Sequence, residues 1–315
     1  MALRDRWRGR AKEQGVDSNS LAVPGKGQTW RAYLMLSPVL IVFGVFVFYP
    51  LVRTFWLGTQ RTDPFGINTV SVGLDQYRDT FSSDSFRRSV VTTFKFVLLT
   101  VPPGLALGLL IAVLAHKPLR GIAFFRGLFS STVASSVAVA SVMWLALFNP
   151  NVGAVPKLLQ SLGWVDRLDL LGDKATALPA VAASTVWLYL GATFIIISAG
   201  LQAIPDEMYE AAEIDGASAW TKFRQVTLPL LTPVLLFVIV MLTINAFQTF
   251  GQIHFLTEGG PGDSTRVLVY SIFEDARKNF DDGRAAVQAV FLFFIMILIA
   301  RIQLWLLERR VHYGQ

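Results

Sequence analysis

The sequence predicts an all-α membrane protein with six transmembrane helices. Only 16% of its 315 residues are charged and 53% are hydrophobic, whereas about a quarter of the residues in a soluble domain are charged. The apolar residues gather in six runs, each close to the roughly 20 residues that cross a bilayer. Polar residues inside these runs are mostly Ser, Thr and Asn, which can hydrogen bond within or between helices. The bilayer is therefore the expected solvent for most of the chain.

Residues 1–31 precede the first run and are predicted to form a basic, disordered cytoplasmic tail. They hold seven Lys or Arg residues against three acidic ones. The apolar run that follows is too long for a secretory signal, which needs a short apolar core and a cleavage site. The rest of the chain, 32–315, is predicted to form one transmembrane domain with its core at about 85–308.

The six predicted spans follow in order. The second contains Pro102 and Pro103, where a kink is expected because proline removes a backbone donor. The third is rich in Ser and Ala, and such small residues let another helix approach closely. The spans are 32–55, 87–115, 121–148, 178–200, 229–251 and 286–307.

The positive residues predict that both termini lie in the cytoplasm. With the N-terminus inside, the inner segments carry 15 Lys or Arg residues and the longer outer segments carry nine. This bias agrees with the positive-inside rule. Because the basic residues lie beside apolar runs rather than on one soluble face, the net charge of +6 does not indicate nucleic-acid binding.

The composition also excludes several kinds of site. Cysteine is absent, so disulfides and thiolate metal sites are excluded. The three histidines, His116, His254 and His312, are far apart in the sequence, and no metal site is expected. The chain has no nucleotide-binding glycine-rich motif.

The inner loop 201–229 has a definite predicted structure. Pro205 can open a helix, because its missing N–H would have no partner there. Gly216 is suited to end that helix in a left-handed turn. Ser218 can cap a second short helix that runs toward Pro229. A helix–turn–helix is therefore expected at the membrane surface.

The same loop carries a recognisable motif. It reads Glu-Ala-Ala at 210–212, then Gly216 after three residues, then Val-Thr-Leu-Pro at 226–229 after nine more. This pattern resembles the EAA loop of ABC importer membrane subunits, with Val226 in place of Ile. The resemblance implies the type I importer permease fold and a cytoplasmic coupling helix that docks on a separate ATPase. The implied coupling residues are Glu210, Ala211, Ala212, Asp215, Gly216, Leu228 and Pro229.

Other stretches are similar to narrower groups of permeases. Residues 256–261, 264–265 and 268–270 look like the equivalent part of carbohydrate-type importers. Residues 63–66, 72–75, 148–150, 308–311 and Tyr313 resemble the first membrane subunit of the glycerol-3-phosphate importer. The implied solute is sn-glycerol 3-phosphate or a glycerophosphodiester such as glycerophosphocholine. A di- or oligosaccharide of the maltose or trehalose type is the alternative.

The resemblance also implies partners and a location. They are a second homologous permease subunit, two ATP-binding subunits that hold ATP and Mg, an extracytoplasmic solute-binding protein and the lipid of a bacterial cytoplasmic membrane. The chain itself is then a transport subunit rather than an enzyme, with no cofactor of its own.

Polar and aromatic residues within the spans are candidates for the solute path. Trp187 and Tyr189 could stack on a polyol, although aromatic residues also form interfacial belts. Asn245 and Gln248 share a helix face and could bond hydroxyls, or simply bond across helices. Lys95 could attract a phosphate, but long side chains also extend to the interface.

Two other classes of protein fit the sequence less well. An ion-coupled transporter often has a buried carboxylate at mid-membrane, and none of the six predicted spans contains Asp or Glu. A membrane enzyme would need clustered acid–base or metal groups, and the carboxylates here are scattered. The charged stretch 274–282 is expected to be a solvated helix that could contact a binding protein.

Overall fold

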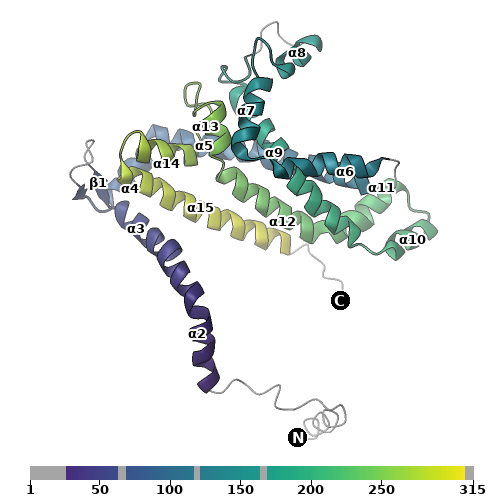
Figure 1. Ribbon diagram of the computed structural model, residues 1–315, viewed down its shortest axis with the longest axis horizontal. Helices are drawn as coiled ribbons and strands as arrows, with labels where there is room; N and C mark the ends of the chain where they lie inside the picture. The colour runs from purple at the N-terminus through teal and green to yellow at the C-terminus, as the bar shows by residue number, and fades with distance from the viewer. Residues whose placement is uncertain (1–25, 63–68, 117–120, 164–168, 309–315) are drawn as a thin grey trace. The chain divides into compact units, whose positions relative to one another are not determined.

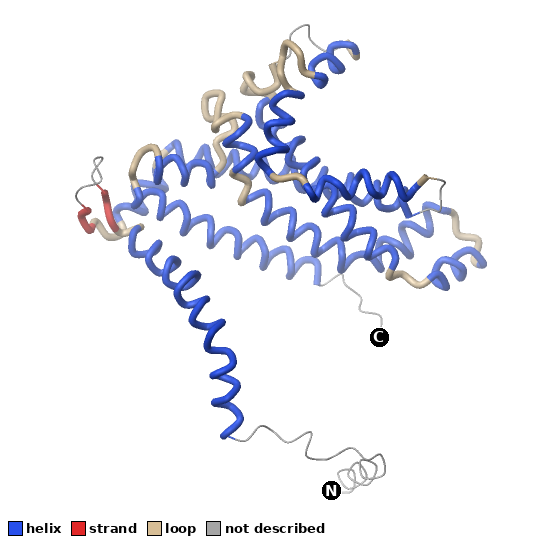
Figure 2. The backbone as a smooth tube through the Cα atoms, viewed as in Figure 1, coloured by secondary structure: helices blue, strands red, loops and turns tan. Residues whose placement is uncertain are grey.

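The computed structural model describes residues 26–62, 69–116, 121–163 and 169–308. The chain divides into two compact units, Met1–Thr54 and Phe55–Gln315, and each is described by itself. Most of the basic tail predicted for residues 1–31 lies outside the described residues. Helices make up most of the structure (Figure 2).

One long apolar helix accounts for the described part of the first unit. Helix α2 (Lys26–Phe43) continues through a π turn, η2 (Gly44–Phe48), into α3 (Tyr49–Leu57). Pro50 has no backbone N–H to donate, and the π turn ends two residues before it. In this turn the N–H of Tyr49 bonds to the carbonyl of Gly44, five residues earlier. Residues Tyr33–Leu57 are long and apolar enough to cross a membrane, which confirms the span predicted at 32–55.

The second unit is a helical bundle. Its only strands in the described ranges are two short antiparallel ones, which pair Gln60 with Ser71. The elements are β1 (Gln60–Thr62), β2 (Thr69–Ser71), α4 (Asp75–Ser82), α5 (Asp84–His116), α6 (Ile122–Ser130), η3 (Ser131–Ala134), α7 (Val137–Leu147), α8 (Ala154–Ser161), α9 (Ala177–Gln202), α10 (Asp206–Ile214), α11 (Ala219–Lys222), η4 (Phe223–Thr227), α12 (Leu228–Phe247), α13 (Gly251–Leu256), α14 (Leu268–Arg277) and α15 (Asp282–Glu308).

Three long helices of this unit, α5, α9 and α12, pack against one another, and α15 packs on α12 (Figure 1). Ile197, Leu231 and Val238 are completely buried in the core that α5, α9 and α12 share. Helices α5 and α9 approach closely at Gly108, where a Cβ atom would lie 2.3 Å from Cγ2 of Thr193. Helix α5 runs through Pro102 and Pro103 without ending, and the expected kink there stays a prediction.

Four further regions match the membrane spans expected from the sequence. Asp84–His116, Ala177–Gln202 and Asp282–Leu306 lie close to the predicted ranges. The fifth span begins earlier than predicted, at Ala219 rather than at 229, and ends at Phe247. The helix passes through Pro229 because a π turn, η4, precedes the proline, and the N–H of Leu228 bonds to the carbonyl of Phe223.

The prediction of one continuous span at 121–148 is wrong. Segments Ile122–Ala134 and Val137–Leu147 are separate helices, and the chain bends by 109° between them. Ser135 and Ser136 have extended backbones, and the hydroxyl of Ser136 accepts a hydrogen bond of 3.3 Å from the N–H of Val139 to cap α7. Ser and Thr side chains compete for backbone groups in this way and favour caps over helix interiors. The described residues thus contain five continuous spans and one bent pair.

Candidate functional site

Residues 205–228 form a compact segment at one end of the second unit, here called the elbow. Helix α10 begins after Pro205, whose backbone is extended, and ends before Gly216, whose φ is +76°. The N–H of Gly216 bonds to the carbonyl of Glu213, and that of Ala217 bonds to Ala212, both at 2.9 Å. This pair of bonds is a Schellman motif, which satisfies the last carbonyls of a helix. The helix–turn–helix predicted from the sequence is confirmed.

Contacts between its two helices hold the elbow together. Ser218 caps α11 by accepting a bond of 3.2 Å from the N–H of Thr221. The ammonium group of Lys222 pairs with the carboxylate of Glu213 on α10. The hydroxyls of Tyr209 and Thr227 lie 3.1 Å apart and connect α10 to η4. Because η4 runs directly into α12, α10 is fastened to the base of a membrane span.

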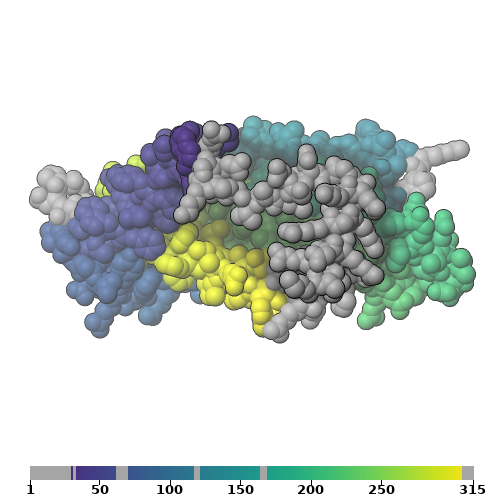
Figure 3. Space-filling view, turned by 90° about the horizontal axis from the view of Figure 1, so that it is seen from below, coloured from purple at the N-terminus to yellow at the C-terminus, as the bar shows by residue number. Residues whose placement is uncertain are grey.

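The outer surface of the elbow combines acidic and apolar side chains. The predicted coupling residues are all in the described part of the chain; Ala212 and Leu228 are half-buried. Two large apolar side chains that the sequence analysis missed, Ile214 and Trp220, are 88% and 67% exposed. Ile214 stands between Glu213 and Asp215, and a large apolar side chain between charges is the signal that could have identified it. Figure 3 shows the elbow (green) as one end of the unit. The exposed coupling residues are Glu210, Ala211, Asp215, Gly216 and Pro229.

A second feature is a cavity of about 740 Å³ beside the first half of α5, here called the cationic cavity. This cavity lies at the start of α9, and the elbow follows the end of α9. Because a 26-residue helix is about 39 Å long, the two features are separated by the length of that helix. The wall of the cavity holds four cations and one carboxylate, a net charge of +3. They are Arg87, Arg88, Lys95, Lys174 and Asp263.

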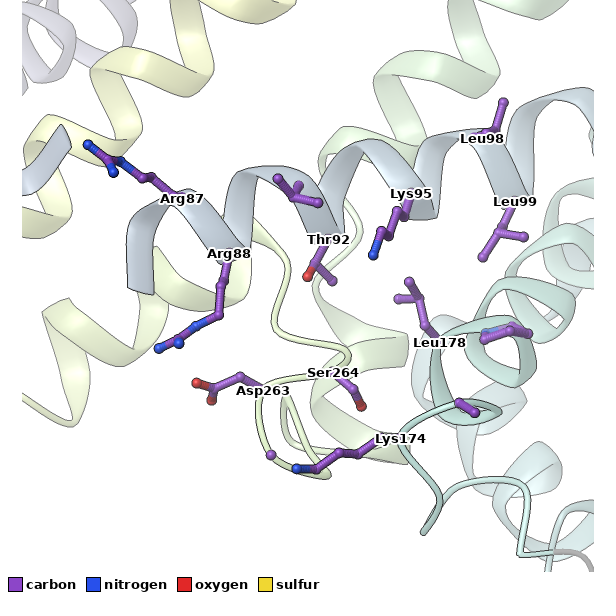
Figure 4. A pocket seen from close by; sticks show the side chains of 14 residues that line it. Arg87, Arg88, Thr92, Lys95, Leu98, Leu99, Lys174, Leu178, Asp263 and Ser264 are labelled. Carbon is purple, nitrogen blue, oxygen red and sulfur yellow. The ribbon is translucent and has the colours of Figure 1, made fainter. Parts of the chain in front are cut away.

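The charged side chains of this cavity come from three separate elements (Figure 4). Arg88 and Lys95 extend from α5 toward the opposite wall, where Lys174 precedes α9 and Asp263 follows α13. The guanidinium group of Arg87 turns away from the cavity and donates to the carbonyl of Phe81. Within the described residues, no carboxylate lies within 4 Å of the head groups of Arg88, Lys95 or Lys174.

A smaller groove of about 310 Å³ adjoins the cationic cavity, and Leu99 and Pro179 line both. Its wall is apolar and includes Trp187. The ring of Trp187 stands edge-on to that of Trp144, with 5.9 Å between the ring centroids. The structure therefore brings two sequence candidates, Lys95 and Trp187, to neighbouring hollows along the α5–α9 interface.

The other three candidates lie elsewhere. Tyr189 packs in the core with Thr185 and Leu242 around a space of only about 10 Å³. Asn245 is half-buried near the end of α12 and Gln248 is exposed. Neither amide lines the cationic cavity or the apolar groove.

The charged stretch 274–282 is only in part the solvated helix that the sequence suggests: Arg277, Lys278 and Asp282 are exposed, but α14 ends at Arg277 and two carboxylates are paired inside the protein. Asp275 is only 2% exposed, because its carboxylate accepts hydrogen bonds from Gln288 and Asn279 and faces Arg284 at 3.4 Å. Glu274 pairs with both Arg266 and Lys278. A hydrogen bond to Tyr270 raises the pKa of Lys278. These carboxylates join α14 to α15 and to the loop before α14.

Comparison with known proteins places the chain among transport proteins. Residues 77–313 match the family described as the binding-protein-dependent transport system inner membrane component. The sn-glycerol-3-phosphate transport system permease protein UgpA of Agrobacterium fabrum is 37% identical over 285 residues, which cover 90% of this chain and 96% of that protein. UgpA of Yersinia enterocolitica is 34% identical over 291 residues, covering 92% and 98%.

Two solved structures share the fold. A bacterial ABC transporter involved in the import of the acidic polysaccharide alginate matches with a TM-score of 0.76 at 21% identity, covering 90% of this chain and 96% of that one. The bacterial alginate ABC transporter in complex with an alginate pentasaccharide-bound periplasmic protein matches with a TM-score of 0.78 at 20% identity, covering 92% and 98%.

Proposed function

The chain belongs to the family of inner membrane components of binding-protein-dependent transport systems, and from this we propose that it forms half of the solute path of an ATP-driven importer. It is a multi-pass membrane protein. The observation that carries the proposal is the exposed elbow, which is fastened by Tyr209 and Thr227 to a helix continuous with a membrane span.

The elbow is the proposed docking point for an ATPase subunit. Two such subunits would bind ATP and Mg, and this chain would hydrolyse nothing itself. Ile214 and Trp220 would enter an apolar groove on the ATPase, and Glu210 and Asp215 would meet basic or backbone donors around it. The remaining partners are a second permease subunit that completes the path and an external binding protein that delivers solute.

The proposed location is the bacterial cytoplasmic membrane, with the elbow and both termini in the cytoplasm. The excess of Lys and Arg on the inner segments supports this orientation. The cationic cavity, at the opposite end of α9 from the elbow, would then open toward the extracytoplasmic side.

The proposed solute is sn-glycerol 3-phosphate or a glycerophosphodiester such as glycerophosphocholine. Support comes from the names of the relatives that are 33–37% identical to this chain. A di- or oligosaccharide is the second candidate, favoured by Trp187 in the apolar groove, since an aromatic face suits a sugar ring.

Uptake by the complete importer in proteoliposomes tests this function. Radiolabelled glycerol 3-phosphate, glycerophosphocholine, maltose and trehalose are offered with the binding protein and ATP. We expect ATP-dependent uptake of a glycerophosphate compound; uptake of the sugars alone would replace the preferred solute with the second candidate.

The role of the elbow is tested in the same assay with Glu210→Lys. This variant reverses an exposed charge and is expected to lower uptake at least tenfold while the permease pair still forms. Asp75→Lys makes the same reversal at an exposed position at the start of α4, away from the elbow, and should transport normally. Normal uptake by Glu210→Lys with the ATPases bound would remove the proposed role.

A further inference from the structure

We infer that the cationic cavity is an anion-recognition site within the permease, where Arg88, Lys95 and Lys174 bind the phosphoryl group of the passing solute. This inference rests on the proposed function, because it names the part of the path that selects the solute. The permease would then add its own selection by charge to that of the binding protein.

The charge of the cavity is the first argument. Charged side chains within membrane spans are costly and usually face a water-filled cavity or a partner charge. Lys95 lies 11 residues into α5, about 16 Å from its start. It has no carboxylate within 4 Å among the described residues, and neither have Arg88 and Lys174. Because Arg87 turns away from the cavity, Arg88, Lys95, Lys174 and Asp263 leave a net charge of +2 facing it, which an anion would balance.

The direction of the side chains is the second argument. A lysine that extends to the membrane interface would leave the cavity, but the ammonium group of Lys95 points into it, toward the side that carries Lys174 (Figure 4). The end of the Lys174 side chain lies against Gly262, where a Cβ would be 2.5 Å from its Cε. This contact places the Lys174 side chain beside the 262–264 loop on the cavity wall.

The chemistry of the wall is the third argument. A phosphoryl group offers three strong acceptor oxygens, and charge-assisted bonds from Lys and Arg are stronger than neutral ones. Ser264 also lines the cavity, and its buried hydroxyl has no hydrogen-bond partner among the residues that the structure describes. Donors from α5, from the segment before α9 and from the 262–264 loop all line this one cavity. The adjoining apolar groove with Trp187 would receive the carbon skeleton.

Charge-selective labelling tests the site without depending on transport. The chain contains no cysteine, so Thr92→Cys places a single thiol on the cavity wall between Arg88 and Lys95. In the assembled complex, an anionic methanethiosulfonate (sulfonatoethyl) and a cationic one (trimethylammonioethyl) are compared by mass spectrometry of this chain. Asn151→Cys, on an exposed turn outside the cavity, gives the reference ratio.

We expect the anionic reagent to be favoured about tenfold at Thr92→Cys relative to Asn151→Cys, since a charged cleft raises the local concentration of counter-ions. The preference should disappear in Arg88→Gln/Lys95→Gln/Lys174→Gln. It should persist in Arg78→Gln/Lys157→Gln/Arg277→Gln, which removes the same charge at exposed positions outside the cavity. An equal ratio at the two cysteines in the otherwise unchanged chain would overturn the inference, and that comparison needs no cation variant to fold.

Protection of the same thiol identifies the source of the anion. The labelling is repeated in nanodiscs of phosphatidylcholine with and without phosphatidylglycerol, with the ATPases held closed by ATP and vanadate. Glycerol 3-phosphate should slow the anionic reagent in both lipids. Protection by phosphatidylglycerol alone would assign the cavity to a lipid headgroup and contradict the solute site.

Transport then separates this inference from the proposed function. Each single variant, Arg88→Gln, Lys95→Gln or Lys174→Gln, should lower uptake of glycerol 3-phosphate about three- to tenfold, the range of one lost charge-assisted bond that is partly screened. ATP hydrolysis stimulated by the binding protein should stay intact, which shows that the complex assembles. If the unchanged importer carries no phosphoryl solute, the proposed solute fails while the labelling result stands. If it does and the triple variant carries it equally well, the inference fails.

Discussion

The hydroxyl of Thr132 accepts a hydrogen bond of 2.9 Å from the backbone N–H of Gly191, and both groups are buried. The contact joins η3, just before the bend between α6 and α7, to the middle of α9. A Cβ atom at Gly191 would lie 2.3 Å from the Thr132 hydroxyl and 2.7 Å from the carbonyl of Phe129. Glycine at this position is what lets the bent pair rest on α9.

Gly191→Ala is therefore expected to destabilise the permease by about 1–3 kcal/mol, the usual cost of overpacking. The measurement is the midpoint of thermal unfolding of the assembled complex. Gly127→Ala is the matched control, because a Cβ at Gly127, on α6, would meet no atom within 4 Å. Equal midpoints for the two variants would show that the close approach at Gly191 is not needed.

The turn of the elbow should respond to backbone strain alone. A Cβ at Gly216 would contact nothing within 4 Å, but its φ of +76° costs an L-residue roughly 1–2 kcal/mol. Gly216→Val should lower the amount of solute carried per ATP hydrolysed, whereas Gly216→Asn, which tolerates this conformation, should keep most of it. A Gly216→Val complex with full coupling would show that the turn is dispensable.

The buried carboxylate of Asp275 should matter for stability rather than for transport chemistry. Asp275→Ala leaves Gln288 and Asn279 without their acceptor, and an unsatisfied buried donor costs about 1–3 kcal/mol. The complex is expected to melt earlier than the Asp282→Ala control, whose carboxylate is exposed. The idea fails if the two complexes melt together.

Substitutions of Trp187 and of Tyr189 should have different effects on solute uptake. Trp187→Ala removes a wall of the apolar groove and is expected to lower uptake severalfold at unchanged complex yield. Tyr189→Phe keeps the ring that packs in the core and should transport normally. The opposite pattern would move the solute path to the other face of α9.

The spans and the elbow could be predicted because their signals are local. Run length and hydropathy define a span, and Pro205, Gly216 and Ser218 define caps within a few residues. The bend at Ser135–Ser136 could not be predicted so readily, since small residues fit a continuous helix equally well until the partner at Gly191 is known.

The cationic cavity could not be predicted from the sequence, for a different reason. Lys95 could be selected because a cation inside an apolar run is conspicuous. Lys174 and Ser264 are far from it in the chain, and only the packing of α9 and the loop before α14 against α5 brings them together. The burial of Asp275 was missed likewise, because its partner Gln288 lies on the next helix.

The helix from Ala219 to Phe247 joins the second half of the elbow to the fifth membrane span without a loop. Its 29 residues would measure about 44 Å if they were straight. A π turn, η4, precedes Pro229, and Pro233 lies one turn further on, and π turns and prolines are the places where helices bend. Force that reached the elbow would therefore enter the span through one short stretch, residues 223–233.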